Sequence, residues 1–232
     1  MSDLLPQTAL QRLLAQLEPW DNAIGRSCGR KLKRRLGRVA LGAFAARLAG
    51  LTAADTCLDL GANVGSFAAA LAETGARVHA YEPDPDTFAR LSANVGHLPN
   101  VTLHQKAVGA RSGTVHLRRA IGYDAQAGHL SQATSVVFDR ADRFAPETIA
   151  VKQVGFRDLL ADLPQVALVK MDIEGAEFDI LADIFDRDMP VSFDALYVET
   201  HETSAPERLW DVRRFRRLAA DLARPHINLY WP

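Results

Sequence analysis

The sequence predicts an α/β protein with a doubly wound, mostly parallel sheet and an N-terminal helical extension. From residue 52 onward, short apolar runs alternate with helical segments, which is the pattern of the units that build parallel sheets. Residues 1–50 show helical spacing and no strand signal. Polar motifs directly follow the apolar runs, where the carboxyl ends of such strands bind ligands.

Length and composition are those of one globular domain. The chain has 232 residues, 48% of them hydrophobic and 24% charged, and its formal net charge is -1. This size suits a domain at residues 51–232 preceded by a basic helical extension at residues 1–50. The small net charge predicts no general attraction to nucleic acid. No secretory signal or membrane-spanning run is evident, so we expect a cytoplasmic protein.

Two helices are predicted in the extension. Leucines at positions 10, 13, 14 and 17 recur at helical spacing, and a second helix continues to Leu48. Between Arg26 and Arg38 this second helix is strongly basic. That charge favours either a solvated helix face over a packed apolar stripe or a peripheral contact with an anionic membrane at its inner face.

The remaining elements follow in order along the chain. Strands are expected at residues 56–60, 77–81, 101–103, 113–117, 166–171 and 195–198. Helices are expected at residues 66–74 and 85–95, the second capped by Asp84 with Pro85 at its first position. A further helix begins near Glu174 or Gly175, and a long loop is expected at residues 122–135. Four arginines at positions 213, 214, 216 and 217 are expected on a solvated helix face.

A glycine-containing turn follows the first predicted strand. Gly61 and Gly65 frame it, and glycine permits both a tight turn and the close approach of a ligand. Asp59, on the strand before the turn, can accept hydrogen bonds from a ligand ammonium or from loop amides. Glu82 lies about twenty residues further on, at the end of the second strand, where a carboxylate can bind both ribose hydroxyls of a nucleoside.

Asn63 decides between two nucleoside cofactors. A dinucleotide site needs a third glycine so that the pyrophosphate can rest on the helix N-terminus. Asn63 crowds that place, whereas its amide can hydrogen-bond the amino-acid part of S-adenosylmethionine. The turn therefore favours S-adenosylmethionine, with NAD(P) as the alternative.

Five segments of the chain together resemble the FkbM family of methyltransferases. They are Leu58-Asp59-Leu60-Gly61-Ala62-Asn63-Val64-Gly65, Tyr81-Glu82-Pro83-Asp84-Pro85, Ala107-Val108-Gly109, Lys170-Met171-Asp172-Ile173-Glu174-Gly175-Ala176-Glu177 and Glu199-Thr200-His201. The resemblance covers about residues 55–202. It implies a Rossmann-like fold of the class I methyltransferase type. It also implies an S-adenosylmethionine-dependent O-methyltransferase that acts on hydroxyls of sugars, glycans or secondary metabolites. Its motifs place Ala62, Pro83, Lys106 and Ala107 beside the cofactor, together with Asp172.

Candidate catalytic residues lie at the ends of the later strands. Methyl transfer to a hydroxyl needs alignment and removal of the acceptor proton. Asp172, Glu199 and His201 are candidate bases, with Lys170 nearby. A neutral imidazole at His201 suits proton abstraction, and Glu199, two residues earlier, could orient it.

The acidic residues of this region allow two further interpretations. Glu174 and Glu177 are expected in the first helical turn, where the helix dipole favours negative charge, and for Glu177 this structural role is preferred. Asp172, Glu174 and Glu199 offer oxygen ligands of the kind that magnesium takes. A divalent metal is possible but not expected.

Two other functions remain open. A nicotinamide-dependent oxidoreductase would need a hydride-site pair such as Tyr-x-x-x-Lys, which the sequence lacks. A catalytically silent module that binds adenosylmethionine or RNA is the other, although no aromatic stacking platform accompanies the basic clusters. The identity of the hydroxyl-bearing acceptor and the oligomeric state are not predicted. We expect removal of residues 1–50 to alter acceptor use or membrane association more than cofactor affinity.

Overall fold

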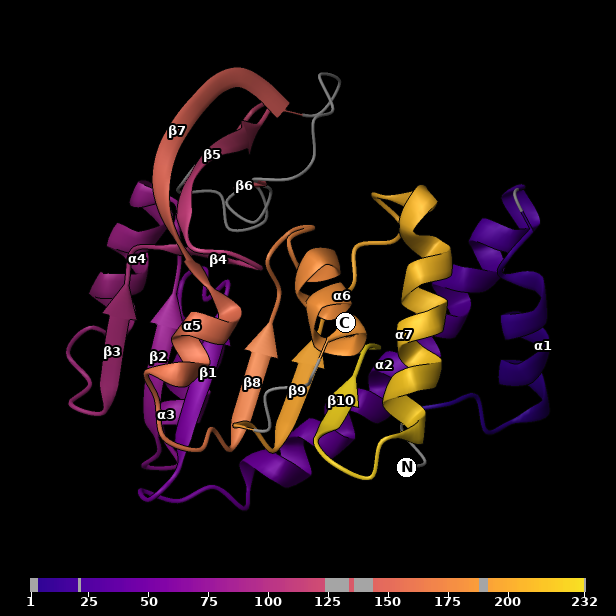
Figure 1. Ribbon diagram of the computed structural model, residues 1–232, viewed down its shortest axis with the longest axis horizontal. Coiled ribbons are helices and arrows are strands. Elements are labelled where there is room, and N and C mark those ends of the chain that lie inside the picture. The colour runs from indigo at the N-terminus through magenta and orange to yellow at the C-terminus, as the bar shows by residue number, and fades with distance from the viewer. Residues whose placement is uncertain (1–3, 21, 124–133, 136–143, 188–191, 232) are drawn as a thin grey trace.

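A parallel sheet forms the centre of the protein, as the computed structural model shows (Figure 1). The model describes residues 4–20, 22–123, 134–135, 144–187 and 192–231. Six described strands lie in the order β10-β9-β8-β1-β2-β3, and every pairing between them is parallel. Their bounds are β1 Thr56–Leu60, β2 Arg77–Tyr81, β3 Val101–His104, β8 Leu168–Met171, β9 Ala195–Val198 and β10 His226–Asn228. The strand order reverses between β1 and β8, which is where such sheets bind ligands.

Helices cover both faces of this sheet, which confirms the doubly wound prediction. One face packs against α2 (Ala23–Leu48), α3 (Ser66–Ala72) and α4 (Pro85–Val95). The other packs against α5 (Phe156–Ala161), α6 (Glu177–Asp186) and α7 (Leu209–Asp221). Figure 1 shows α5 and α7 in front of the strands. Two apolar cores, one on each face, therefore hold the strand ends in fixed positions.

The starts of α4 and α6 differ from each other in how well the sequence predicts them. Asp84 caps α4, since its Oδ1 accepts the amides of Asp86 and Thr87, as expected. Helix α6 begins at Glu177, two or three residues after the start predicted near Glu174 or Gly175. Glu174 has a φ of 52°, outside the helical region, so it lies in the turn before the helix and not in its first turn.

A second sheet lies above the carboxyl ends of the main strands (Figure 1). Its order is β4-β7-β5-β6, with bounds β4 Ala107–Gly109, β7 Phe144–Gly155, β5 Gly113–Ala120 and β6 Thr134–Ser135. The strand expected at residues 113–117 is thus β5 in a separate, largely antiparallel sheet. Of the loop expected at residues 122–135, positions 134 and 135 form β6, and positions 124–133 lie outside the described residues.

The two N-terminal helices form as predicted, α1 at Ala9–Leu17 and α2 at Ala23–Leu48. Leu32 and Leu36 of α2 are buried, whereas most of its basic side chains are exposed: Arg26, Arg30, Lys31, Arg34, Arg35 and Arg38. This arrangement supports the solvated-face interpretation, and contact with a membrane stays a prediction. Among the described residues, no helix combines the length and the apolar character needed to cross a membrane.

Helix α7 corrects the expectation that its four arginines lie on a solvated face. Arg214 and Arg217 are exposed, but Arg216 is only 5% exposed and Arg213 is half-buried. Arg216 Nη2 lies 2.7 Å from Oε1 of Glu202, a carboxylate that is itself buried. The spacing of the four arginines placed Arg216 on the inner face of the helix, so it must pair with an acidic residue there.

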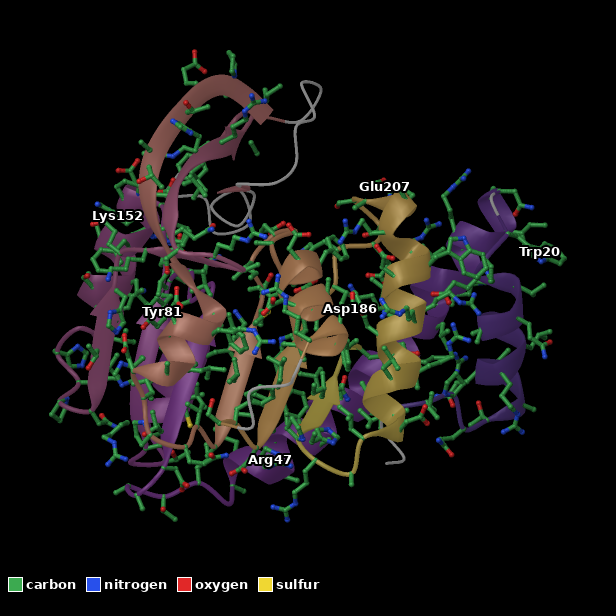
Figure 2. All side chains as sticks on the ribbon, in the orientation of Figure 1. Trp20, Arg47, Tyr81, Lys152, Asp186 and Glu207 are labelled. Carbon is green, nitrogen blue, oxygen red and sulfur yellow. The ribbon has the colours of Figure 1, made fainter. Side chains whose placement is uncertain are left out.

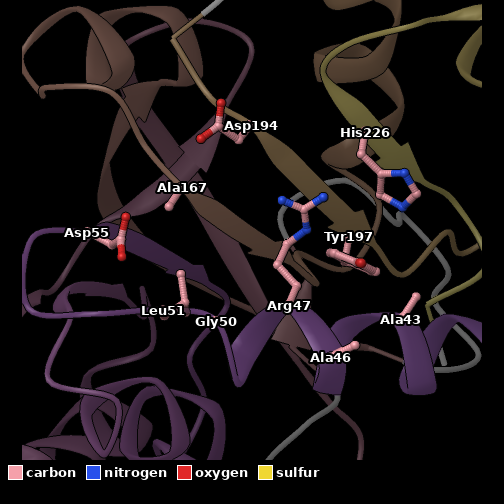
Figure 3. Close-up of a pocket in the computed structure, with 10 residues that line it drawn as sticks. All are labelled: Ala43, Ala46, Arg47, Gly50, Leu51, Asp55, Ala167, Asp194, Tyr197 and His226. Atoms are coloured by element: carbon pink, nitrogen blue, oxygen red, sulfur yellow. The ribbon is translucent and has the colours of Figure 1, made fainter.

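A hollow of about 610 Å³ lies at the amino ends of the strands. Asp55, Ala167 and Asp194, each just before a strand, line it together with His226. Figure 3 shows Arg47 reaching from α2 toward the middle of this hollow. It lies at the edge of the sheet opposite the predicted site residues, so it does not belong to the candidate site.

Candidate active site

The glycine turn after β1 adopts a conformation that only glycine tolerates at both ends. Gly61 has a φ of 76°, and a Cβ there would lie 1.7 Å from the carbonyl oxygen of Asp172. Gly65 has a φ of 93°, and a Cβ there would lie 2.9 Å from Leu91 of α4. Both glycines thus approach other parts of the protein closely, and the close approach of a ligand stays a prediction. The two glycines bring the turn against the β8 end and against α4.

Glu82 lies directly beneath this turn and is 6% exposed. Its Oε2 accepts the amide of Asn63 at 3.0 Å, and its Oε1 accepts the amide of Asp84 at 2.9 Å. Burial raises the pKa of Glu82 to about 7, although these two hydrogen bonds lower it. Each carboxylate oxygen keeps a lone pair, so the group can still accept hydrogen bonds from a pair of hydroxyls.

Asn63 presents an unsatisfied polar atom at the same place. Its backbone is in the left-handed region, with a φ of 50°. Its Oδ1 is buried and has no hydrogen-bond partner among the residues that the structure describes. A buried acceptor without a partner is costly, so this atom is suited to a donor group on a ligand.

The other predicted cofactor residues surround the β2 and β3 ends. Ala62 and Ala107 are buried, Pro83 is half-buried and Lys106 is exposed. The amide of Glu82 donates to the carbonyl of His104, which joins the β2 end to the segment that contains Lys106. These residues are near one another, and their contact with a cofactor stays a prediction.

Lys170 is a buried cation that ties three segments together. Its Nζ donates to the carbonyl of Gly61 at 2.7 Å and lies 3.4 Å from Asp59 Oδ1 and 3.7 Å from Asp172 Oδ2. Burial lowers the pKa of Lys170, but the charges of Asp59 and Asp172 outweigh it and raise the pKa above its usual value. These contacts favour the charged form of Lys170, and its catalytic role stays a prediction.

Asp59 lies beside the ammonium of Lys170. Its carboxylate is fully buried. Burial raises the pKa of Asp59, while Lys170 lowers it. Neither oxygen of Asp59 has a hydrogen-bond partner among the described residues, so a contact with a ligand ammonium stays a prediction.

Carboxylates converge where β8 and β9 end. Asp172 follows β8, Glu199 follows β9, and both are half-buried. Burial and the charge of Asp172 raise the pKa of Glu199. Burial likewise raises the pKa of Glu174 to about 7, although His201 lowers it. The crowding of like charges favours a positively charged ligand at this end of the sheet.

His201 is held by Glu177 and not, as expected, by Glu199. The backbone amide of His201 donates to Glu177 Oε1 at 3.0 Å, and the ring Nδ1 lies 2.9 Å from the same oxygen. Glu177 has no solvent exposure. Glu177 therefore has two roles. It begins helix α6, as preferred, and it also fixes the orientation of the His201 imidazole. Glu199 was expected to orient His201 because residues two apart on an extended chain lie on the same side. Strand β9 ends at Val198, so this rule does not hold for Glu199 and His201.

The surroundings of His201 also determine its charge. Its Nε2 lies 3.4 Å from Glu174 Oε2 and 3.7 Å from Asp172 Oδ1. Burial lowers the pKa of His201, but the hydrogen bond to Glu177 and the neighbouring carboxylates raise it to about 9. This shift favours the positively charged ring at neutral pH. These contacts favour the protonated ring, and the neutral imidazole that proton abstraction needs stays a prediction.

The same residues could hold a cation. Asp172, Glu199 and His201 each place a possible ligand atom within 4.8 Å of the others. The sequence suggested Glu174 as a third oxygen ligand, whereas this geometric grouping has His201 in its place. Two carboxylates and an imidazole are a common donor set for divalent metals.

Two residues next to the candidate site, Arg119 and Tyr123, were not predicted from the sequence. Arg119 of β5 donates from Nε to Asp84 Oδ2 at 2.6 Å, and the hydroxyl of Tyr123 lies 3.0 Å from Asp84 Oδ1. These contacts fasten the end of β5 beside Glu82 and Pro83. Only the capping role of Asp84 was visible in the sequence, because its partners lie 35 or more residues away.

The loop after β9 is anchored by buried charge. Arg216 donates to Glu202 and to the carbonyl of Leu229, and Lys33 of α2 donates to the carbonyl of Thr200. The bonded residues Thr200 and Glu202 directly precede and follow His201 in the sequence. They fix the loop between α2 and α7, so both helices help to position the candidate base.

Comparison with known proteins gives a consistent result. A family model described as the methyltransferase FkbM domain matches residues 59–220. The chain is 26% identical over 174 residues to hexuronic acid methyltransferase AglP of Haloferax volcanii, covering 73% of this chain and 66% of that protein. It is 29% identical over 140 residues to 2-O-methyltransferase NoeI of Sinorhizobium fredii, covering 54% and 55%. It is 28% identical over 163 residues to 31-O-demethyl-FK506 methyltransferase FkbM of Streptomyces tacrolimicus, covering 59% and 62%.

These alignments span between about half and two thirds of each relative's own length. The family match covers well over half of this chain. It runs from Asp59 to beyond the start of α7 and includes the glycine turn, Glu82 and the acidic cluster. The chain therefore belongs to the FkbM methyltransferase family.

Proposed function

We propose that the protein is an S-adenosylmethionine-dependent O-methyltransferase that acts on a hydroxyl of a sugar, glycan or secondary metabolite. The observation that carries this proposal is the placement of Glu82 and Asn63, in a member of the FkbM family, next to an acidic cluster with a histidine. Glu82 and Asn63 suit a nucleoside with an amino-acid tail, and the cluster suits deprotonation of an alcohol.

The described residues fit S-adenosylmethionine. Glu82 would accept the two ribose hydroxyls, and the buried Oδ1 of Asn63 would accept a donor from the amino-acid part. Asp172 would face the positive charge of the donor. A pyrophosphate would meet the same carboxylates and be repelled, which argues against NAD(P).

His201 and Asp172 would carry the chemical work of the protein. The bound donor supplies an activated methyl group on a positively charged sulfur. Neutral His201 would take the proton of the acceptor hydroxyl while the oxygen forms its bond to the methyl carbon and the carbon–sulfur bond breaks. The products are a methyl ether, S-adenosylhomocysteine and a proton on the imidazole. Glu177 would hold the ring in place, and Asp172 would stabilise the resulting imidazolium.

We propose that this reaction proceeds without a metal. The carboxylates of the cluster already face two cations, the buried Lys170 ammonium and the His201 imidazolium. A divalent ion bound by Asp172, Glu199 and His201 would need the imidazole to lose its proton and would occupy the proposed base. Activity that survives dialysis against a chelator would support this arrangement.

The acceptor is proposed from chemistry that the relatives share. Two of the relatives are named for methylation at a specified oxygen, and the third is named for a hexuronic acid. A hydroxyl on a sugar or on a polyketide ring is an aliphatic alcohol with a high pKa, so it needs a positioned base of the kind that His201 provides.

The direct test uses labelled methyl donor. The full chain is incubated with radiolabelled S-adenosylmethionine and with extract fractions enriched in lipid-linked sugars, polysaccharides and small molecules. We expect label in one of these pools. We expect Glu82→Ala to bind S-adenosylmethionine at least about tenfold more weakly in calorimetry, because it loses hydrogen bonds to both ribose hydroxyls.

Glu73→Ala is the matched control, since Glu73 is an exposed carboxylate at the far end of α3. It should bind the donor as the unmodified protein does. Unchanged affinity in Glu82→Ala would refute the ribose assignment. Absence of donor binding in the unmodified protein would refute the proposed function itself.

The pH dependence of the reaction should report on Glu177. Below its pKa of about 9, His201 is protonated, so kcat/KM should rise with pH toward that value. Glu177→Gln removes the negative charge that stabilises the imidazolium. The rising limb should therefore move to lower pH, by about one to two units. A pH–rate profile measures this shift, and Asp179→Asn, an exposed change on the same helix, should leave the limb in place. A limb that is unmoved in Glu177→Gln would exclude His201 as the group that titrates.

A further inference from the structure

A second cavity lies beside the candidate active site. It has a volume of about 470 Å³ and is formed by the start of α2, the turn between α1 and α2, and the loop that joins β9 to α7. Glu202 and Thr203, which directly follow His201, are among its lining residues. Figure 2 shows Glu207 at the end of α7 nearest the carboxyl edge of the sheet and Trp20 at the outer side of the α1–α2 turn. The volume is in the range of small-molecule sites.

Two tryptophans border this cavity and expose much of their surface. Trp20 is 50% exposed and Trp210 is 63% exposed. The backbone of Trp20 packs closely against the start of α2, because a Cβ on Gly25 would lie 1.9 Å from the Trp20 carbonyl oxygen. Aromatic faces carry partial negative charge and attract the weakly positive C–H groups of a sugar ring. Exposed tryptophans beside a cavity next to an alcohol-modifying site therefore favour a saccharide ligand.

The floor of the cavity provides a hydrogen-bond acceptor without a partner. Glu202 is 7% exposed, and its Oε2 has no hydrogen bond within the described part of the chain. Its charge is balanced by Arg216 at 2.7 Å and Lys33 at 3.8 Å. A buried carboxylate oxygen in this condition can accept a hydroxyl of a ligand without a new charge imbalance.

The rim of the cavity carries exposed charges of both signs, Arg30 and Glu207. Glu18 is neutralised by Arg213 and Arg216, each 3.7 Å away. Arg30 is exposed and makes no ion pair with any residue that the structure describes. A free guanidinium at the mouth of an aromatic-lined cavity is suited to bidentate binding of a carboxylate.

We propose that this cavity binds a sugar ring that carries a carboxylate, as part of an acceptor that reaches from here to His201. The ring stacks on Trp210 or Trp20, its hydroxyl donates to Glu202, and its carboxylate binds Arg30. Lys33, which contacts both Glu202 and the carbonyl of Thr200, connects this subsite to the catalytic loop. The acceptor is then an acidic oligosaccharide and α2 selects it. The claim that the bound saccharide is methylated rests on the proposed function. The binding of the saccharide to this cavity does not.

A glycan array tests the proposal without turnover. The fluorescently labelled full chain, saturated with S-adenosylhomocysteine, is applied to an array of neutral and carboxylate-bearing oligosaccharides. We expect binding to a subset of the acidic glycans. Trp210→Ala and Arg30→Gln should each weaken that binding by about tenfold or more, because each removes a direct contact with the ring. Arg38→Gln is the matched control, since Arg38 is exposed on the same helix outside the cavity.

Each other result of the experiment has a defined meaning. An array without bound glycans, binding confined to neutral glycans, or an equal loss in Arg38→Gln would overturn the proposal. Calorimetry with S-adenosylhomocysteine verifies that the variants are folded. A protein that binds acidic glycans but not the cofactor product would refute the proposed function and leave this subsite intact.

Discussion

Replacing His201 with alanine is expected to lower kcat by about 100- to 10,000-fold, which is the range contributed by a positioned general base. The aliphatic hydroxyl of the proposed acceptor transfers its proton only with difficulty unless a base is within reach. The cofactor contacts proposed for Glu82 and Asn63 lie at the β1 and β2 ends, so the dissociation constant of S-adenosylmethionine should change little. Single-turnover transfer of labelled methyl and calorimetry measure the two quantities separately.

His97→Ala is the control for this experiment, because His97 is exposed in the loop after α4. It should leave kcat unchanged. A normal kcat in His201→Ala would make Asp172 the favoured base, and Asp172→Asn would then show the large loss. A parallel loss of cofactor affinity in His201→Ala would mean that the imidazole positions the donor and does not act on the acceptor.

The resting charge of His201 has a consequence for the order of events. Three carboxylates lie within 3.7 Å of the imidazole and favour its protonated form. A cationic donor bound near Asp172 would compete for that negative charge and lower the pKa of the ring. Donor binding would thus prepare the base, and deprotonation of an acceptor before the donor is present would be suppressed. This fits a site in which the alcohol becomes nucleophilic only in the complete complex.

Local patterns in the sequence predicted the main sheet well. β1, β2 and β9 have the bounds that their apolar runs predict, and α4 starts at the residue after the Asp84 cap. Each of these features depends on a few consecutive residues. The side chains of a buried strand are apolar on both faces, and a capping residue acts on amides two and three positions away. A few consecutive residues of the sequence are therefore enough to predict these strands and the start of α4.

Features that depend on distant partners were not predictable in this way. The sequence places Glu177 near a helix start, but its contact with His201 joins residues 24 apart and depends on how β8 and β9 pair. Likewise, β7 was missed although it is long, because its residues alternate weakly and Pro146 interrupts the pattern. The register of β5 and β7 shifts near that proline. Arg216 looked like a surface residue because nothing near it in the sequence shows Glu202.

Replacing Phe44 with alanine is expected to reduce the free energy of unfolding by about 3–5 kcal/mol, a large part of the 5–15 kcal/mol that is typical of a domain. Phe44 is 5% exposed and packs edge-on against Tyr197, with ring centroids 5.2 Å apart, and against Trp231 at 4.4 Å. Tyr197 belongs to β9, so this contact joins the N-terminal extension to the central sheet. Urea denaturation at constant m-value measures the loss.

Leu41→Ala is the matched control, because Leu41 is on the same helix and is 42% exposed, and it should cost well under 1 kcal/mol. Equal costs for the two variants would show that α2 is only loosely attached to the sheet.

The packing of Phe44 changes the result that we expect when residues 1–50 are removed. Deleting residues 1–50 would expose Tyr197 and Trp231 together with the surface that α2 covers, so we expect the remaining chain to lose its fold and its cofactor affinity together. The extension that was expected to tune acceptor use is then also a structural layer, and its role in recognition must be tested by single substitutions such as Arg30→Gln.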